Sequence, residues 1–204
     1  MGEPILQVNG LEKSYYAGLL ARRRTFHLEA HFSVAAPEII GVMGPNGSGK
    51  TTLFELITGS NTPSRGEVIC VGQNIHRVRN DQRDRLAIHY HQSYQVRHFR
   101  HTKPQFLMET ASLDYPAVHL FDEPQFNTQD GYIGFMLDFF RKLRRDGRLV
   151  FLCMHPSEEF HLEILQEVCE RFIFVQNGRI SHADSFGDLT RHEPVRAYLG
   201  GLLK

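Results

Sequence analysis

Residues 44–52 of the chain have the sequence Gly44-Pro45-Asn46-Gly47-Ser48-Gly49-Lys50-Thr51-Thr52. This stretch matches the phosphate-binding pattern G-x-x-x-x-G-K-[ST], in which glycines let backbone N–H groups fold around an anion. The apolar run 38–43 before it is typical of a buried strand, and residues 53–57 after it are typical of a helix. That order is what a phosphate site at a helix N-terminus requires, and it argues against a chance glycine-rich turn. The stretch predicts a nucleoside triphosphate site, with Lys50 at the β- and γ-phosphates and the Thr51 hydroxyl on Mg²⁺.

The composition limits the kinds of protein the chain can be. Its 204 residues fit one domain, residues 1–204, with a substantial core. Lys and Arg total 23 and so do Asp and Glu, so no overall field favours nucleic acid or an anionic membrane. The cysteines, Cys70, Cys153 and Cys169, show no pairing pattern, and the first two lie in apolar runs, which favours core positions in a reducing compartment. With no signal-peptide pattern and no apolar run of ~18 residues, we expect a cytoplasmic protein without direct membrane insertion.

The first part of the chain has the two-residue period of β-strands. Apolar residues alternate over residues 5–11 and more strictly over 26–34, and residues 66–72 form another strand-like run between turns. This period indicates half-buried antiparallel strands. The stretch 15–25 lies between these strands, and its arginine triplet Arg22-Arg23-Arg24 is predicted to be a solvated loop; a contact with phosphate or a partner is the alternative.

The second part of the chain changes to alternating strands and helices. The short apolar runs 117–121 and 149–154 indicate strands buried on both faces, as in a parallel sheet. Between them residues 133–145 have helical spacing of apolar residues, and a second helix is expected over 158–170 before a strand at 171–175. We therefore predict an α/β fold with a mostly parallel sheet, flanked by helices and preceded by an antiparallel β subdomain.

Three charged or titratable side chains follow the predicted parallel strands. Leu120-Phe121-Asp122-Glu123-Pro124 ends one strand with two carboxylates, and His155 ends the next. Ligands of parallel sheets sit at the carboxyl ends of the strands, where the phosphate loop also lies. Asp122 is then placed to hold Mg²⁺, Glu123 to polarise a water, and His155 to bond the γ-phosphate. Taken alone, the two carboxylates also fit an acidic turn that closes a strand, and His155 also fits an exposed or structural histidine.

Taken together, these motifs resemble those of the ATP-binding cassette (ABC) ATPase family, which has the P-loop NTPase fold. Residues 44–52, 120–124 and 154–155 are similar to its Walker A, Walker B and switch-histidine motifs. The resemblance extends over nearly the whole chain, because residues 175–180 are similar to the closing hairpin and 195–200 to the C-terminal helix of some transporter subunits. It implies binding of ATP with Mg²⁺ by a transporter-type subunit.

Two further site residues follow from the resemblance. Residues 11–15 are similar to the aromatic loop that stacks on adenine, which makes Tyr15 the stacking residue and Tyr16 its substitute. Residues 88–92 are similar to the strand that delivers the Q-loop glutamine, so Gln92 is expected to contact Mg²⁺ or the attacking water. The resemblance therefore implies that Lys50, Gln92, Glu123 and His155 act on the phosphates and the attacking water.

The chain departs from the family pattern after Gln92. Family members usually insert a helical subdomain there, with a Leu-Ser-Gly-Gly-Gln signature, but Asp122 follows Gln92 by only 30 positions and the sequence has no Leu-Ser-Gly-Gly run. If residues 103–111 match the helix after the signature, residues 98–102 take its place, and they contain no glycine that would let the backbone approach a phosphate. Residues 125–129 also differ from the usual loop after Walker B. We expect the helical subdomain to be reduced or absent.

This departure affects the expected function. In the family two cassettes enclose ATP head to tail, and each signature completes the partner's site. Two copies of this chain would form two incomplete sites, so we expect weak or partner-dependent hydrolysis. The expected partners are a membrane permease, which would hold the chain at the inner face of a membrane, or a second cassette, which leaves both homodimer and heterodimer open. The alternatives are a nucleotide-sensing regulatory or scaffold protein without turnover and, with less support, an ABC protein that acts on nucleic acid.

The segment from residue 89 to residue 101 is rich in histidine. It contains four histidines, two arginines and interspersed aromatic residues. The patterns fit a metal site, with His89 and His91 on one side of a strand, or a contact with phosphate or nucleic acid. The simplest interpretation is a polar surface exposed by loss of the helical subdomain.

Overall fold

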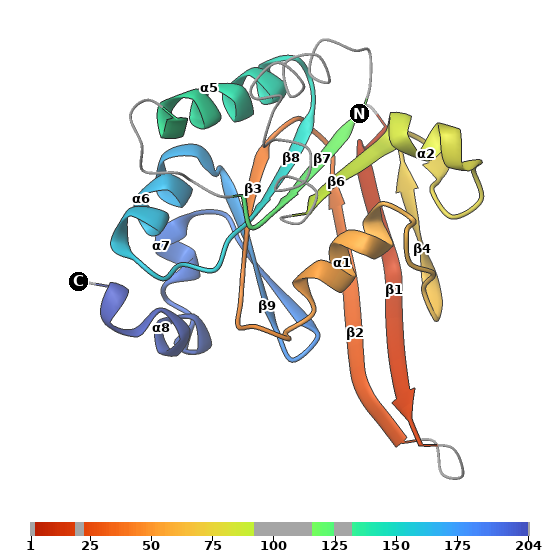
Figure 1. Ribbon diagram of the computed structural model, residues 1–204, viewed down its shortest axis with the longest axis horizontal. Helices are drawn as coiled ribbons and strands as arrows, with labels where there is room; N and C mark the ends of the chain where they lie inside the picture. The colour runs from red at the N-terminus through yellow and green to blue at the C-terminus, as the bar shows by residue number, and fades with distance from the viewer. Residues whose placement is uncertain (1–2, 19–22, 92–115, 125–131, 204) are drawn as a thin grey trace.

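The chain forms an antiparallel sheet and a mostly parallel sheet with helices packed on both faces of the latter. The computed structural model describes residues 3–18, 23–91, 116–124 and 132–203. Figure 1 shows the long strands of the antiparallel sheet beside the parallel sheet, with helix α1 (Lys50–Ile57) close to both. This arrangement confirms the predicted α/β class with an N-terminal antiparallel subdomain.

The antiparallel sheet has the strand order β2-β1-β4-β5. Its strands are β1 (Leu6–Ala17), β2 (Arg23–Val34), β4 (Arg65–Cys70) and β5 (Gln73–Asn74). The first two strands are longer than the sequence predicted, because pairing continues to Tyr15 opposite Phe26 and Ala17 opposite Arg23. The predicted loop is therefore wrong for Arg23 and Arg24, which belong to β2, although both are solvent-exposed as expected.

The second sheet has the strand order β10-β9-β3-β8-β7-β6. Its strands are β3 (Ile39–Met43), β6 (Ala87–His91), β7 (Val118–Asp122), β8 (Leu149–Cys153), β9 (Arg171–Gln176) and β10 (Arg179–Ala183). All neighbouring pairs are parallel except β9 and β10, which form the expected hairpin. Strands β3, β7 and β8 are buried at every position, which explains their continuous apolar sequences.

The helices divide the core into two layers. Helix α1 packs between the second sheet and the antiparallel sheet, where its Leu53 and Phe54 join Phe151 of β8. The opposite layer is formed by α5 (Tyr132–Arg145), α6 (Glu159–Val168), α7 (Phe186–Leu189) and α8 (Glu193–Leu199), followed by a short 3₁₀ turn at Gly200–Leu202. Cys70 and Cys153 are buried in the first layer, which confirms them as core residues.

Several helix boundaries differ from the sequence prediction. Helix α6 begins one residue later and ends two residues earlier than the predicted range 158–170. Helix α2 (Asn80–Leu86) was not predicted, because Leu86 is its only buried residue and the segment has no apolar period. The short helix α7 was also missed. Within the described ranges, no helix is long and apolar enough to cross a membrane.

Some predictions concern residues that lie outside the described parts of the chain. These are Gln92, the histidine-rich residues from 98 to 101, the proposed signature position at 98–102, the helix at 103–111 and the altered loop at 125–129. The prediction that the helical subdomain is reduced or absent therefore rests on the spacing of motifs in the sequence.

Candidate nucleotide-binding site

The loop at residues 44–49 connects the buried strand β3 to the N-terminus of α1. Its backbone has left-handed φ angles at Gly47, 73°, and at Gly49, 113°. A Cβ atom on Gly49 would lie 2.8 Å from the Phe26 ring, and one on Gly44 would lie 2.0 Å from the Val175 carbonyl oxygen. Glycine therefore suits the backbone conformation of this loop. It also lets the loop pass close to strand β2 at Gly49 and close to strand β9 at Gly44.

The turn between β9 and β10 braces the same loop from the side. Gly178 donates its backbone N–H to the Ser48 carbonyl oxygen at 2.9 Å, and its own carbonyl accepts from Glu29 at 2.8 Å. Any side chain at Gly178 would collide with the His27 backbone, since a Cβ would lie 1.8 Å from that carbonyl oxygen. The closing hairpin thus joins the loop to the antiparallel sheet.

The Lys50 side chain is folded into the loop. Its ammonium group donates to the carbonyl oxygens of Gly44 at 2.7 Å and Pro45 at 2.9 Å, and the residue is only 6% exposed. The loop backbone therefore holds a positive charge at the N-terminus of α1, where the helix dipole also favours an anion.

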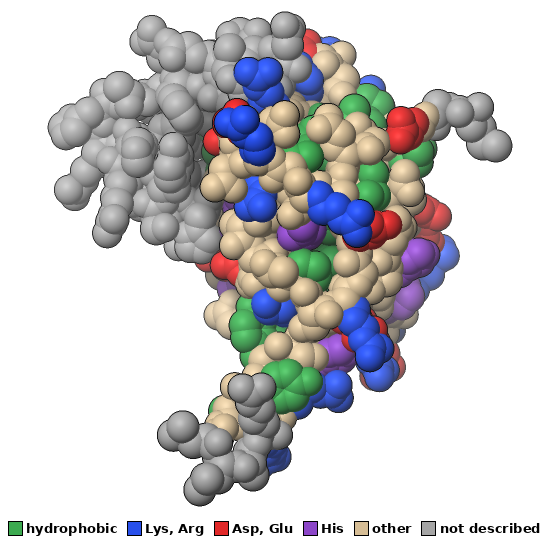
Figure 2. All heavy atoms as spheres, turned by 90° about the vertical axis from the view of Figure 1, so that its right-hand side faces the viewer, with side chains coloured by type: hydrophobic (Ala, Val, Ile, Leu, Met, Phe, Trp, Pro, Cys, Tyr) green, Lys and Arg blue, Asp and Glu red, His purple; other side chains and the backbone are tan. Residues whose placement is uncertain are grey.

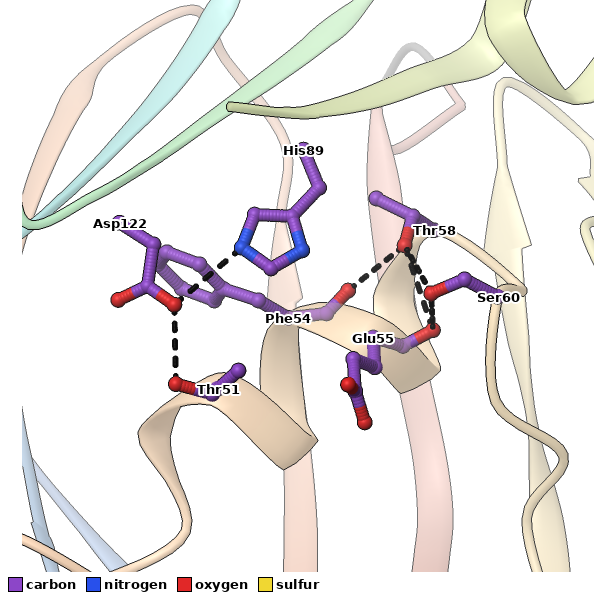
Figure 3. Close-up of polar contacts among 7 residues, drawn as sticks. All are labelled: Thr51, Phe54, Glu55, Thr58, Ser60, His89 and Asp122. Carbon is purple, nitrogen blue, oxygen red and sulfur yellow. Dashed lines mark hydrogen bonds and ion pairs between the residues drawn. The ribbon is translucent and has the colours of Figure 1, made fainter. Parts of the chain in front are cut away.

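The Thr51 and Asp122 side chains meet across α1 and β7. The Thr51 hydroxyl donates to Asp122 Oδ2 at 2.9 Å, and His89 Nε2 of β6 donates to the same oxygen at 3.3 Å (Figure 3). Burial acts to raise the pKa of Asp122, but these hydrogen bonds outweigh it and hold the pKa below its ordinary value. Asp122, 4% exposed, is thus an ionised carboxylate at the carboxyl end of the sheet.

Glu123 has a strained backbone next to this contact. Its φ angle of 51° is in the left-handed region, which is uncommon for a residue other than glycine, and its N–H donates to the Cys153 carbonyl oxygen at 2.9 Å. The side chain lines the same pocket as Lys50 and Thr51. Strain of this kind concentrates at functional sites, so the observed outlier supports a functional position for Glu123.

A pocket of about 290 Å³ unites most of the predicted site. It is lined by Tyr15, Phe26, Asn46, Gly47, Gly49, Lys50, Thr51, Thr52 and Glu123. Tyr15 is 39% exposed, and its hydroxyl accepts a hydrogen bond of 2.8 Å from Asn61. Tyr16, 58% exposed, does not line the pocket. Of the two tyrosines, Tyr15 therefore has the position expected for a stacking residue.

His155 lies after β8 but is not among the residues that line the pocket. Its Nδ1 is 2.8 Å from the hydroxyl of Tyr198 in α8. The neighbouring Met154 N–H bonds the Val42 carbonyl oxygen at 3.0 Å, which places the end of β8 beside the end of β3. The structure thus brings His155 to the correct edge of the sheet, next to a tyrosine that the sequence had not associated with it.

The side chains fit a phosphate group together with a small divalent cation. Thr51 and Asp122 offer oxygen atoms 2.9 Å apart, and oxygen donors of this kind suit Mg²⁺. The glycine-rich backbone and Lys50 suit the anion. Among the described residues, no group of three or more His, Cys, Asp or Glu side chains could hold a metal by itself, so the metal interpretation of the histidine-rich segment gains no support there.

Three residues at the site were not identified from the sequence. Phe26 lines the pocket from β2, His89 holds Asp122, and Tyr198 contacts His155. Their partners lie far away in the sequence, and although His89 and Tyr198 fall within stretches that resemble the family, the resemblance gave neither residue a role at the site. The alternation of 26–34 was the one signal available for Phe26, since it placed that residue on the buried face of a strand.

Comparison with known proteins points to one family. A family model described as ABC transporter matches residues 28–113, which include the loop at 44–52 and end before Asp122. The chain is 34% identical over 103 residues to the high-affinity branched-chain amino acid transport ATP-binding protein LivG of Escherichia coli, covering 50% of this chain and 35% of LivG. It is 37% identical over 82 residues to the energy-dependent translational throttle protein EttA of the same species, covering 40% of this chain and 14% of EttA.

Similarity to solved structures covers more of the chain. The structure of an ATP-binding subunit of an ABC transporter aligns with a TM-score of 0.68 and 19% identity, over 98% of this chain and 100% of that one. At this identity the likeness shows the fold alone. The sequence matches, by contrast, span about a third or less of the length of the curated relatives.

Proposed function

We propose that this chain is an ATP-binding cassette ATPase and that it binds Mg-ATP in the pocket beside residues 44–52. The observation that supports the proposal most directly is the Thr51–Asp122 contact of 2.9 Å next to the buried Lys50 ammonium group. Together they set a cation-binding oxygen pair beside an anion-binding loop. The backbone N–H groups of residues 46–49 and Lys50 would bind the phosphates, and Tyr15 would stack on the base.

Thr51 and Asp122 would hold Mg²⁺, which would supply positive charge beside the phosphates. In that arrangement Glu123 would accept a proton from the attacking water, and His155 would donate a hydrogen bond to the terminal phosphate. Gln92 would orient the water or contact the metal. These positioning and electrostatic roles are the ones that dominate phosphoryl transfer.

A nucleotide-binding test separates this site from nonspecific binding. Equilibrium titration with Mg-ATP should give saturable binding that Lys50→Ala weakens at least tenfold, because a charge-assisted contact to phosphate is lost. The matched control is Lys142→Ala, which removes an exposed lysine paired with Asp146 on α5. Equal affinities of the two variants would contradict the proposal.

We further propose that the chain works as an ATP-binding subunit of a transporter or related complex, whose partner supplies a signature motif. The sequence spacing after Gln92 supports this dependence, since two copies alone would lack both signatures. A membrane permease or a second cassette would be that partner, and the chain would then lie at the inner face of a membrane. Turnover by the isolated chain on the order of 1 s⁻¹ or more, a rate typical of enzymes, would contradict partner dependence.

A second candidate function is a nucleotide sensor that does not hydrolyse ATP. The absence of a Leu-Ser-Gly-Gly run favours it, whereas Glu123 and His155 favour hydrolysis. Steady-state ATPase assays with and without a signature-bearing cassette distinguish the two functions. If the chain hydrolyses ATP, Glu123→Gln should abolish turnover and spare ATP binding. A role on nucleic acid has less support, because the formal net charge is zero and Figure 2 shows acidic and basic side chains intermingled over the face it draws.

A further inference from the structure

The C-terminal helix reaches the candidate site through a single hydroxyl group. The Tyr198 oxygen is 2.8 Å from His155 Nδ1, and the centroids of the two rings are 5.7 Å apart. No described residue is shown bonded to His155 Nε2. Among the described residues, His155 is therefore held at one ring nitrogen, Nδ1.

The position of Tyr198 is set by the core. Its helix α8 begins with Pro194 in its first turn and buries Val195 and Leu199 against the layer that contains α5 and α6. The Tyr198 ring also packs on Phe174 of β9, with centroids 5.6 Å apart. The hydroxyl is thus presented to His155 by a helix and a strand, both of which have buried anchors.

The surroundings of Tyr198 indicate the direction of its hydrogen bonds. Burial raises the pKa of the Tyr198 hydroxyl, so it remains a phenol with a proton to donate. The backbone of Gly44 acts in the opposite direction and lowers that pKa. A phenol that keeps its proton can donate it to His155 Nδ1, which lies 2.8 Å from the Tyr198 oxygen.

We propose that Tyr198 is a positioning residue for His155, to whose Nδ1 it donates a hydrogen bond. A neutral imidazole that accepts at Nδ1 has its proton on Nε2. Tyr198 thereby fixes both the tautomer and the ring orientation of His155 and leaves an Nε2–H donor for a terminal phosphate. This role rests on the proposed function, because it requires a nucleotide whose terminal phosphate meets His155.

A purely structural role for the contact would fasten α8 to the sheet without serving His155. The two roles differ in what they predict for nucleotide recognition. Fastening alone would affect Mg-ATP and Mg-ADP equally, and it would do so whether or not residue 155 is histidine. Positioning affects only the nucleotide with a terminal γ-phosphate, and it requires the imidazole.

The first measurement needs no substitution and no nucleotide. Nitrogen-15 NMR of the histidine side chains in the unaltered chain, assigned with His155→Ala, should show His155 protonated at Nε2 and accepting at Nδ1. Tyr198→Phe, which keeps the ring and removes only the hydroxyl, should move the Nδ1 resonance toward that of an unbonded nitrogen. A proton on Nδ1 in the unaltered chain would overturn the proposal, even if Mg-ATP binds normally.

The second measurement is a double-mutant cycle on nucleotide affinity, made in a Glu123→Gln background to prevent turnover. Tyr198→Phe should weaken Mg-ATP binding about fivefold, the scale of one hydrogen bond, and leave Mg-ADP binding unchanged. The same substitution in a His155→Ala background should cause no further loss. An equal loss for both nucleotides, a loss that persists without His155, or no loss at all would overturn the proposal.

A matched control removes the same group from another tyrosine–histidine pair. Tyr90→Phe deletes the hydroxyl that is 3.1 Å from His119 Nδ1 in the core. It should leave the affinity for Mg-ATP unchanged in the folded protein, with melting temperatures recorded for both variants. Failure of the unaltered chain to bind Mg-ATP would contradict the proposed function, whereas the NMR measurement would still decide the Tyr198–His155 contact.

Discussion

Two polar side chains buried on strand β7 are accommodated in opposite ways. Asp122, at the carboxyl end, is an ionised carboxylate that accepts hydrogen bonds from Thr51 and His89. His119, three positions earlier and 1% exposed, stacks beside Phe121 and shares one hydrogen bond with Tyr90. Burial, reinforced by the charge of Arg148, lowers the pKa of His119 to about 3, against a smaller opposite influence from the Pro116 backbone. The carboxyl end of β7 thus carries the charge of Asp122, whereas His119 within the strand is a neutral imidazole.

The difference shows how a parallel sheet separates structural from functional positions. The middle of β7 is covered on both faces, so a charged group there would lose its hydration without a partner. At the carboxyl end Asp122 is also buried, but α1 and β6 bring donors to its carboxylate, from Thr51 and His89. Substitutions in the middle should therefore change stability, and substitutions at the end should change ligand binding.

The largest effect is expected from Phe121, next to Asp122 but on the opposite face. Its ring lies 4.5 Å from that of Tyr90 and 4.9 Å from that of Phe140. Phe121→Ala should reduce the free energy of unfolding by about 3–5 kcal/mol, because it leaves a cavity among these rings. Urea unfolding measures the loss, and Phe160→Ala on the partly buried side of α6 should cost less. If Phe121→Ala cost no more stability than Phe160→Ala, the proposed difference between structural and binding positions on β7 would be contradicted.

Asp122→Asn should produce the converse result. If the proposed Mg-ATP site is correct, affinity for Mg-ATP should fall about 10- to 100-fold, since a charged group of the metal site is neutralised. The free energy of unfolding should change by about 1 kcal/mol or less, because an amide can keep a hydrogen bond to Thr51. Titration calorimetry and urea unfolding measure the two quantities, with Asp146→Asn, just after the end of α5, as control. Unchanged affinity in Asp122→Asn would remove Asp122 from the binding site.

His119 should make stability depend on pH. Its pKa is about 3 in the folded chain and near 6.5 when unfolded, so the unfolded state binds more protons between these values. The stability that His119 contributes is complete above about pH 6.5 and is lost as pH falls, by at most about 1.4 kcal/mol per unit. Since other histidines also titrate, the measured quantity is the difference between the unaltered chain and His119→Gln. Parallel pH profiles for the two proteins would contradict this account.

The smallest effect is expected at the exposed rim of the pocket. Tyr15→Leu should weaken nucleotide binding by about 1 kcal/mol, because stacking on the base is lost, while Tyr15→Phe should retain most of the affinity. Tyr16→Leu, at a side chain that does not line the pocket, is the matched control. If Tyr16→Leu weakened binding more than Tyr15→Leu, the stacking role would belong to Tyr16.

Much of the fold could be predicted because its signals are local. The alternation of 26–34 and the apolar runs at 117–121 and 149–154 identified strands of the correct sheet type. Helix α2 could not be predicted in the same way, since it buries only Leu86 and its existence depends on the surrounding chain. The outer ends of β1 and β2 were missed for a related reason, because exposed residues such as Tyr16 and Arg24 pair without showing a burial pattern.

The sequence by itself determined the phosphate loop at 44–52, the carboxylates at 122–123 and the mostly parallel sheet, because each depends on neighbouring residues or on a short period. Only the tertiary structure decided which side chains meet these groups: His89 at Asp122, the Gly178 turn at Ser48, and Tyr198 at His155. Such contacts join segments that lie far apart in the chain, and their geometry follows from strand order and helix packing. A local pattern specifies the chemistry of each group, whereas the packed fold specifies its partners.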